Sequence, residues 1–155
     1  MRSFLISLAL FVFSFQGIKA QKLYKGETTF EKILIYSIED FNIYKGSKTW
    51  NKPIYSYDSQ SFYIGSSRFH GQRLFNFEGN YVYLVSEGFS NKIIYTVTEN
   101  KIYSGDSTFS SDCLFTLKDG KIYRGDSSFI SDILFTLEAN ENVNMHVIAC
   151  LIGPY

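Results

Sequence analysis

The chain has 155 residues, of which 45% are hydrophobic, 18% aromatic and 19% charged, with 15 basic residues against 15 acidic ones. This length suits a single domain, and the aromatic content excludes a disordered polar chain. The balanced charge leaves no electrostatic footprint for nucleic acid or anionic lipid, and two histidines and two cysteines are too few for a metal centre rich in these residues.

Residues 1–20 have the pattern of a signal peptide. Arg2 supplies a positive charge, residues 4–13 form an apolar run, and Ala20 is a small residue suited to cleavage before Gln21. The run is shorter than the roughly 20 apolar residues that a membrane-spanning helix needs. We therefore expect an exported protein, periplasmic, cell-surface or extracellular, with no transmembrane segment in the mature chain and a net charge of −2 once Arg2 and Lys19 are removed.

Six copies of a unit of about 20 residues follow the signal. Each copy opens with an apolar residue and a tyrosine; a glycine follows two residues later, except at Val85, and an aromatic residue follows six residues later. This regularity predicts one supersecondary unit repeated six times. The repeated residues are Tyr24, Gly26, Phe30; Tyr44, Gly46, Trp50; Tyr63, Gly65, Phe69; Tyr83, Phe89; Tyr103, Gly105, Phe109; Tyr123, Gly125, Phe129.

The second half of each copy alternates between apolar and other residues. In the last copy Ile133, Phe135 and Leu137 share one parity, which predicts a strand with one buried face. Arg73 breaks this pattern in the third copy, so we expect that strand to fray or to face something polar. Tight turns such as Asp119-Gly120 follow these strands and predict antiparallel hairpins.

The hairpins predict an all-β fold over residues 21–142. Our preferred arrangement is a twisted antiparallel meander of six hairpin repeats of about 20 residues; the alternatives are a β-solenoid and a closed barrel, prism or trefoil. The other connection in each copy has about eight residues, and we expect its aromatic residue to fold inward onto the sheet. Burial would explain the repetition of most aromatics, whereas exposed Tyr and Trp50 would offer platforms for sugars or a protein.

Residues 143–155 depart from the repeat and form an apolar C-terminal segment. Because the last repeat of an array exposes an edge and an apolar face, we expect this segment to cap it as a strand or short helix. Cys150 lies in this segment and Cys113 in the fifth copy. A disulfide between them would contribute roughly 3–4 kcal/mol; the alternative is that both are small buried apolar residues.

The copies at 101–120 and 121–140 resemble the hairpin repeats of exported bacterial proteins built on Tyr-x-Gly units, and more loosely MORN repeats. This resemblance covers most of the mature chain. It departs from MORN units at Asp106-Ser107 and Asp126-Ser127, where a tryptophan is usual, and in lacking a glycine in the second strand. The resemblance implies stacked hairpins and a scaffolding role, and it carries over no functional residue.

The polar residues give no sign of catalysis. Asp106, Asp112, Asp126 and Asp132 do not recur in the other copies, as calcium ligands of a repeat would, so we interpret them as caps of loop amides. No serine lies in a nucleophile elbow. We expect no catalytic residue, no metal ligand, no cofactor and no enzymatic activity.

The predicted function is therefore a structural or interaction module that binds a protein or polymer along its repeats. A carbohydrate-binding module that uses exposed aromatics is the alternative. In either case the partner is a protein or polysaccharide and not nucleic acid. The candidate binding residues are Trp50, Phe69, His70 and Arg73.

Overall fold

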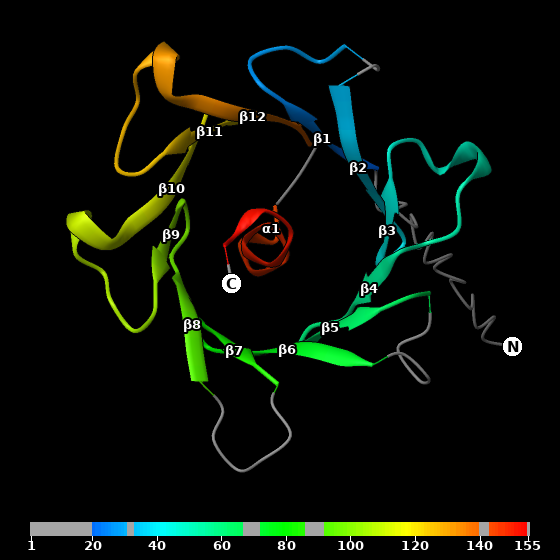
Figure 1. The fold of residues 1–155 in the computed structure, drawn as a ribbon, viewed down its shortest axis with the longest axis horizontal. Helices are drawn as coiled ribbons and strands as arrows, with labels where there is room; N and C mark the ends of the chain where they lie inside the picture. The colour runs from blue at the N-terminus through cyan, green and yellow to red at the C-terminus, as the bar shows by residue number, and fades with distance from the viewer. Residues whose placement is uncertain (1–19, 31–32, 67–71, 86–91, 140–142, 155) are drawn as a thin grey trace, which may run out of the picture.

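The fold is known from a computed structural model that describes residues 20–30, 33–66, 72–85, 92–139 and 143–154. Within these residues the chain forms twelve strands and ends in a helix (Figure 1). The elements are β1 (Gln21–Lys25), β2 (Leu34–Glu39), β3 (Asn42–Lys45), β4 (Tyr55–Tyr57), β5 (Ser61–Ile64), β6 (Arg73–Glu78), β7 (Tyr81–Leu84), β8 (Lys92–Val97), β9 (Lys101–Ser104), β10 (Cys113–Lys118), β11 (Lys121–Arg124), β12 (Ile133–Glu138) and α1 (Met145–Ile152).

The strands form a closed antiparallel barrel. Each strand pairs with its neighbours in the sequence, and β1 pairs with β12, with Leu23 opposite Leu137 and Tyr24 opposite Thr136. The predicted all-β fold of antiparallel hairpin repeats is confirmed. The sheet takes the closed form that we considered as an alternative to an open meander, because closure pairs the two edges that an open sheet would leave exposed.

Tight turns join successive repeats, from the second strand of one copy to the first strand of the next, at β2–β3, β4–β5, β6–β7, β8–β9 and β10–β11. At the predicted turn between β10 and β11, Lys118 lies opposite Lys121, and Asp119 and Gly120 have φ values of 51° and 70°. Two successive residues with positive φ match the right-handed twist of the strands. The same reversal joins β2 to β3, where Asp40 and Phe41 adopt this conformation.

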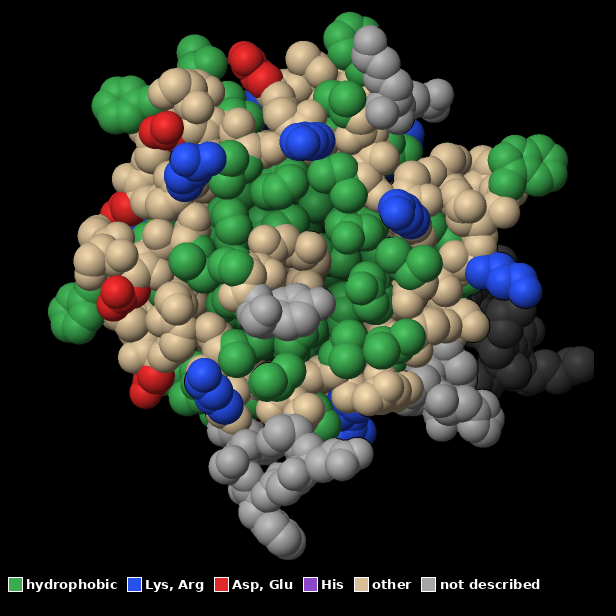
Figure 2. Space-filling model, viewed as in Figure 1, with side chains coloured by type: hydrophobic (Ala, Val, Ile, Leu, Met, Phe, Trp, Pro, Cys, Tyr) green, Lys and Arg blue, Asp and Glu red, His purple; other side chains and the backbone are tan. Residues whose placement is uncertain are grey.

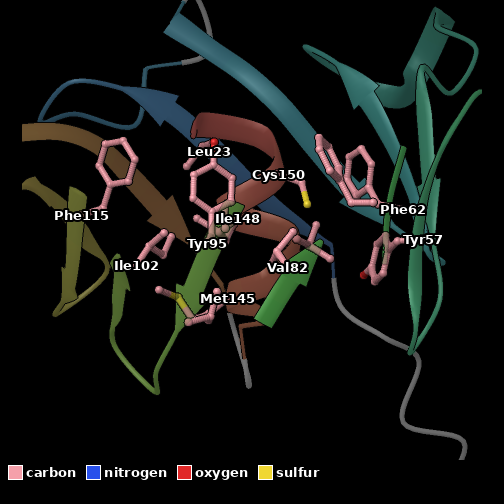
Figure 3. Close-up of a cluster of buried hydrophobic side chains, with 14 of the residues drawn as sticks. Leu23, Tyr57, Phe62, Val82, Tyr95, Ile102, Phe115, Met145, Ile148 and Cys150 are labelled. Carbon is pink, nitrogen blue, oxygen red and sulfur yellow. The ribbon is translucent and has the colours of Figure 1, made fainter. Parts of the chain in front are cut away.

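The lumen of the barrel is filled by apolar side chains around a central helix. The apolar residue before each repeated tyrosine is 0–1% exposed, and α1 runs along the axis of the barrel (Figures 1 and 3). The C-terminal segment therefore lies inside the barrel and does not cap an edge. A twelve-strand barrel encloses more space than its own inward side chains fill, and the helix occupies it. The six residues are Leu23, Ile43, Phe62, Val82, Ile102 and Ile122.

A break in register explains why Arg73 is tolerated in a strand. The pairing shifts near the start of β6, between the pairs Phe62–Phe75 and Tyr63–Arg73, and the equivalent shift occurs in β10 beside Cys113. The irregularity interrupts the alternation, as β-bulges do. Arg73 is exposed, with its guanidinium 5.8 Å from the centre of the Tyr63 ring. It neither frays the strand nor enters the lumen.

The barrel has two different ends. The tight turns form the turn end, where the first turn of α1 lies and His146 Nε2 is 3.0 Å from the Gly79 carbonyl oxygen. The long connections leave from the other end, the petal end, where Pro154 lines a pocket with Leu84 and Gly105. No helix among the described residues is long and apolar enough to cross a membrane.

Candidate functional site: the petal rim

We call the six long connections petals 1 to 6, and those that the structure describes project outward around the barrel wall (Figure 1). They comprise residues 26–33, 46–54, 65–72, 85–91, 105–112 and 125–132, of which 31–32, 67–71 and 86–91 lie outside the described residues. The described petals are the parts of their repeats that extend farthest from the barrel. They are therefore the natural place to look for a binding surface.

A repeated set of hydrogen bonds fixes the base of each petal. The Gly105 amide donates to the Ile94 carbonyl at 2.8 Å, and its own carbonyl accepts from Thr96 Oγ1 at 2.7 Å. Gly105 has a φ of 62°, a left-handed backbone conformation that favours glycine because glycine has no Cβ atom to clash with the backbone. Equivalent amide bonds occur at all six bases, including Val85, whose amide donates to Leu74 at 2.9 Å. The first residue of every petal is thus held to the barrel by the same backbone hydrogen bond.

The repeated tyrosines lie on the outer wall of the barrel, at the foot of the petals where these are described. Tyr24, Tyr44, Tyr63, Tyr103 and Tyr123 are each less than 9% exposed, although they point away from the lumen. The structure thus has two buried layers, one inside the barrel and one between its wall and the petals. The second layer uses the tyrosines and leaves little room there for another aromatic ring.

Short 3-10 turns form the described petal tips, and serine and aspartate side chains hold them. In petal 5, Ser107 Oγ donates to Asp112 at 2.5 Å and accepts from the Phe109 amide at 3.2 Å. The Asp112 amide in turn donates to the Phe109 carbonyl at 2.9 Å. Ser127 and Asp132 make the same side-chain contact in petal 6. The serines thus cap loop amides, whereas the aspartates, which we predicted to cap amides themselves, accept from the serine hydroxyls instead.

The aromatic residue at each described petal tip points into solvent. Trp50 is 94% exposed, Phe109 76%, Phe129 75% and Phe30 64%, and apolar side chains protrude around the rim in Figure 2. The prediction that these residues fold inward is therefore wrong. The helix fills the lumen and the tyrosines fill the space under the petals, so neither layer takes another ring. Phe69 and Phe89 lie outside the described residues.

Neighbouring petals are tied together through Asp126. Its carboxylate lies 2.6 Å from Lys101 Nζ and accepts from Ser110 Oγ at 2.5 Å, which joins petals 5 and 6. The Lys101 ammonium, followed by the Ser110 hydroxyl, lowers the pKa of Asp126 below its ordinary value. On the next strand pair Lys121 Nζ donates to the Glu27 carbonyl of petal 1. These contacts fix the spacing of the tips around that part of the rim.

A polar groove lies over β5, β6 and β7. It has a volume of about 380 Å³, and its lining includes Tyr63, Arg73 and Tyr83. Asn76 stands there at the position that holds serine or threonine in the other copies, and its Oδ1 accepts from Ser61 Oγ at 3.1 Å. Departures from the repeat thus meet in one groove. Both departures from the repeat, Arg73 and Asn76, are visible in the sequence, but our sequence analysis singled out only Arg73.

The candidate binding residues do not form one cluster in the described part of the chain. Trp50 lies on petal 2, whereas Arg73 lies at the start of β6 and lines the polar groove. Phe69 and His70 belong to petal 3 outside the described residues. Among the residues that are described, no group of three or more His, Cys, Asp or Glu side chains is placed to hold a metal ion.

The two cysteines are free and buried. Cys113 lies on the barrel wall outside the central cluster, with its Sγ 3.7 Å from Thr116 Oγ1. Cys150 belongs to α1 and packs within the central cluster, and its burial raises the pKa of its thiol. The structure therefore agrees with the interpretation as two small buried apolar residues, and the possible disulfide is not formed.

His146 makes stability sensitive to acid. Burial, opposed in part by the hydrogen bond to the Gly79 carbonyl, lowers its pKa below 6.5, and its ring lies 5.2 Å from the Phe77 ring. Because the unfolded chain then binds the proton more readily, the free energy of unfolding should fall as pH drops below about 6.5. In urea denaturation at a series of pH values, His146→Gln should flatten this decline. An unchanged slope would contradict it.

Comparison with known proteins places this repeat architecture in a family. No curated protein and no solved structure matches the chain. Residues 17–151 match the family described as the 6-fold beta flower protein, and this stretch contains all six hairpins, all six petals and most of α1. With a match that covers most of its length, the chain belongs to the 6-fold beta flower family.

Proposed function

We propose that the protein is an exported, non-enzymatic interaction module that binds a protein or polymer through the aromatic tips of its petals. The observation that carries this proposal is the exposure of Trp50, at 94%. Export rests on the signal-peptide pattern of residues 1–20. The Tyr-x-Gly likeness to exported bacterial repeats and to MORN scaffolds favours the same role.

The arrangement of the tips supports multivalent binding. Phe30, Trp50, Phe109 and Phe129 occupy the same position in different petals and are all exposed, so each presents an apolar ring at a similar place on its petal. A single exposed ring gives a weak contact, but several rings engaged by one partner add through effective concentration. A repetitive polymer or an oligomeric protein is the kind of partner that such a rim favours.

The test begins with Trp50, the only tryptophan. Its emission should be red-shifted and readily quenched by acrylamide, because water surrounds its ring. Partners captured from cell-envelope extracts by the wild-type protein should be lost by the variant Trp50→Ala/Phe109→Ala/Phe129→Ala. The matched control is Ile130→Ala, which removes a side chain that is 71% exposed beside Phe129. Equal capture by the triple variant and the wild type would contradict the proposal.

The polar groove favours carbohydrate binding as a second candidate function. Tyr83 offers a partly exposed ring, and Gln60, Arg73 and Asn76 offer hydrogen-bonding groups to sugar hydroxyls within the same groove. In a titration with a panel of soluble oligosaccharides, Arg73→Ala/Asn76→Ala should weaken binding, while the petal-tip triple variant should not. The reverse pattern would assign glycan binding to the tips.

A further inference from the structure

The petal end of the barrel has an apolar centre surrounded by basic residues. Leu74, Ile94, Leu114 and Leu134 are partly buried beside this end, with Leu151 and Ile152 of α1 among them. The residue before each petal glycine adds exposed Lys25, Lys45 and Arg124, and Ile64 is 43% exposed. Figure 2 looks onto this end and shows a broad apolar area with Lys and Arg side chains around it, and Asp and Glu side chains farther out on one side.

The turn end carries the opposite charge. In and beside its tight turns, the described part of the chain has seven acidic residues against four lysines, Lys22, Lys101, Lys118 and Lys121. Two of these lysines direct their ammonium groups to the petals, Lys101 to Asp126 and Lys121 to the Glu27 carbonyl. The near-zero net charge of the whole chain therefore conceals a separation of charge along the barrel axis. The acidic residues are Glu39, Asp40, Asp58, Glu78, Glu99, Asp119 and Glu138; Lys48 of petal 2 pairs with the first two, at 3.0 Å from Glu39 and 3.9 Å from Asp40.

The turn end also has an apolar recess. A pocket of about 640 Å³ opens there, lined by Val97, Leu117, Val143 and Met145 together with His146 and polar groups of the turns. The two ends of one barrel are thus complementary in charge, and both have apolar groups near the axis. The same twelve strands form both ends of the barrel, so each end presents a ring of the same number of strand ends.

We propose that a second copy of this chain docks its turn end onto the petal end, so that barrels stack head to tail. Contact between two petal ends would oppose Lys25, Lys45 and Arg124 to their own copies, and contact between two turn ends would oppose acids to acids. Like charges across an interface disfavour association. The head-to-tail contact avoids both conflicts, and because it does not close on itself it produces a linear stack.

The first test is sedimentation velocity of the purified protein over a range of concentrations and salt. We expect oligomers that grow with concentration and shrink as salt rises from 50 mM to 500 mM, because salt screens the charges between the two ends. Lys25→Glu should weaken self-association about tenfold or more. Lys52→Glu changes the net charge equally but lies on petal 2, and it should have little effect. A monomer under every condition would overturn the proposal.

A charge swap provides the decisive experiment. Lys25→Glu/Lys45→Glu makes both ends acidic, and Glu78→Lys/Glu99→Lys weakens the acidity of the turn end; each variant alone should associate less than the wild type. Mixed together they should associate again, because the reversed petal end of one variant matches the reversed turn end of the other. Near-ultraviolet circular dichroism verifies that both variants fold. Failure of the mixture to associate would overturn the proposal, as would binding of the wild-type protein to anionic phosphatidylglycerol vesicles without self-association.

Discussion

Replacing Phe62 with alanine is expected to destabilise the protein by about 3–5 kcal/mol. Phe62 is 1% exposed, and its ring lies 5.1 Å from the Tyr55 ring and 5.9 Å from the Phe75 ring. The substitution removes this aromatic contact and opens a cavity in the wall of the lumen. Surrounding side chains relax only partly into such a cavity, because they are held by β4, β5 and β6.

Urea denaturation measures this effect, and Phe109→Ala is its matched control. The two substitutions remove the same atoms, but Phe109 is 76% exposed, so its loss should change the free energy of unfolding by less than about 0.5 kcal/mol. The difference between the two free energies of unfolding tests whether Phe62 is buried in the core and Phe109 exposed at a petal tip. Similar values for both would mean that the tips contribute to the core, contrary to the structure.

A chain that ends at Asn144 is expected not to form a stable barrel. Truncation removes α1, whose Met145, Val147, Ile148, Ala149 and Cys150 are buried. Burial of each large apolar side chain contributes roughly 1.5–3 kcal/mol, so the loss is comparable to the roughly 5–15 kcal/mol that stabilise a typical domain. The twelve strands would also surround an apolar lumen without a partner.

Circular dichroism and thermal unfolding test the truncated chain. A chain ending at Gly153 keeps the helix and loses exposed Pro154, and it should unfold with nearly the wild-type midpoint. Ile148→Ala, which empties part of one buried position, should give an intermediate result. Cooperative unfolding of the Asn144 truncation near the wild-type temperature would show that the helix is not required.

The sequence predicted the parts of the fold that depend on neighbours along the chain. The spacing of Tyr103 and Tyr123 defined the repeat, and Asp119-Gly120 defined a hairpin turn, because both are local features. The pairing of Leu23 with Leu137 depends on the summed twist and curvature of six hairpins. No single copy contains that information, so closure remained one of several alternatives.

The petal tips could not be placed for a related reason. An aromatic residue such as Phe109 is typical of a buried position, and whether it is buried depends on what already occupies the space nearby. That space is taken by Tyr103 under the petal and by α1 in the lumen. The outward position of Arg73 likewise depends on a shift in pairing with β5, which the alternation within β6 does not reveal.

The central helix limits how this repeat protein can evolve. An open array can lengthen by duplicating a unit, because each unit contacts only its neighbours. Here buried side chains of every unit also belong to one core cluster with α1, whose diameter with side chains is about 10–12 Å whatever its sequence. A seventh hairpin would widen the lumen beyond the reach of Ile148, and the loss of one would crowd it. The size of the helix therefore fixes the number of units. We expect family members to differ in their petals and not in their number of units.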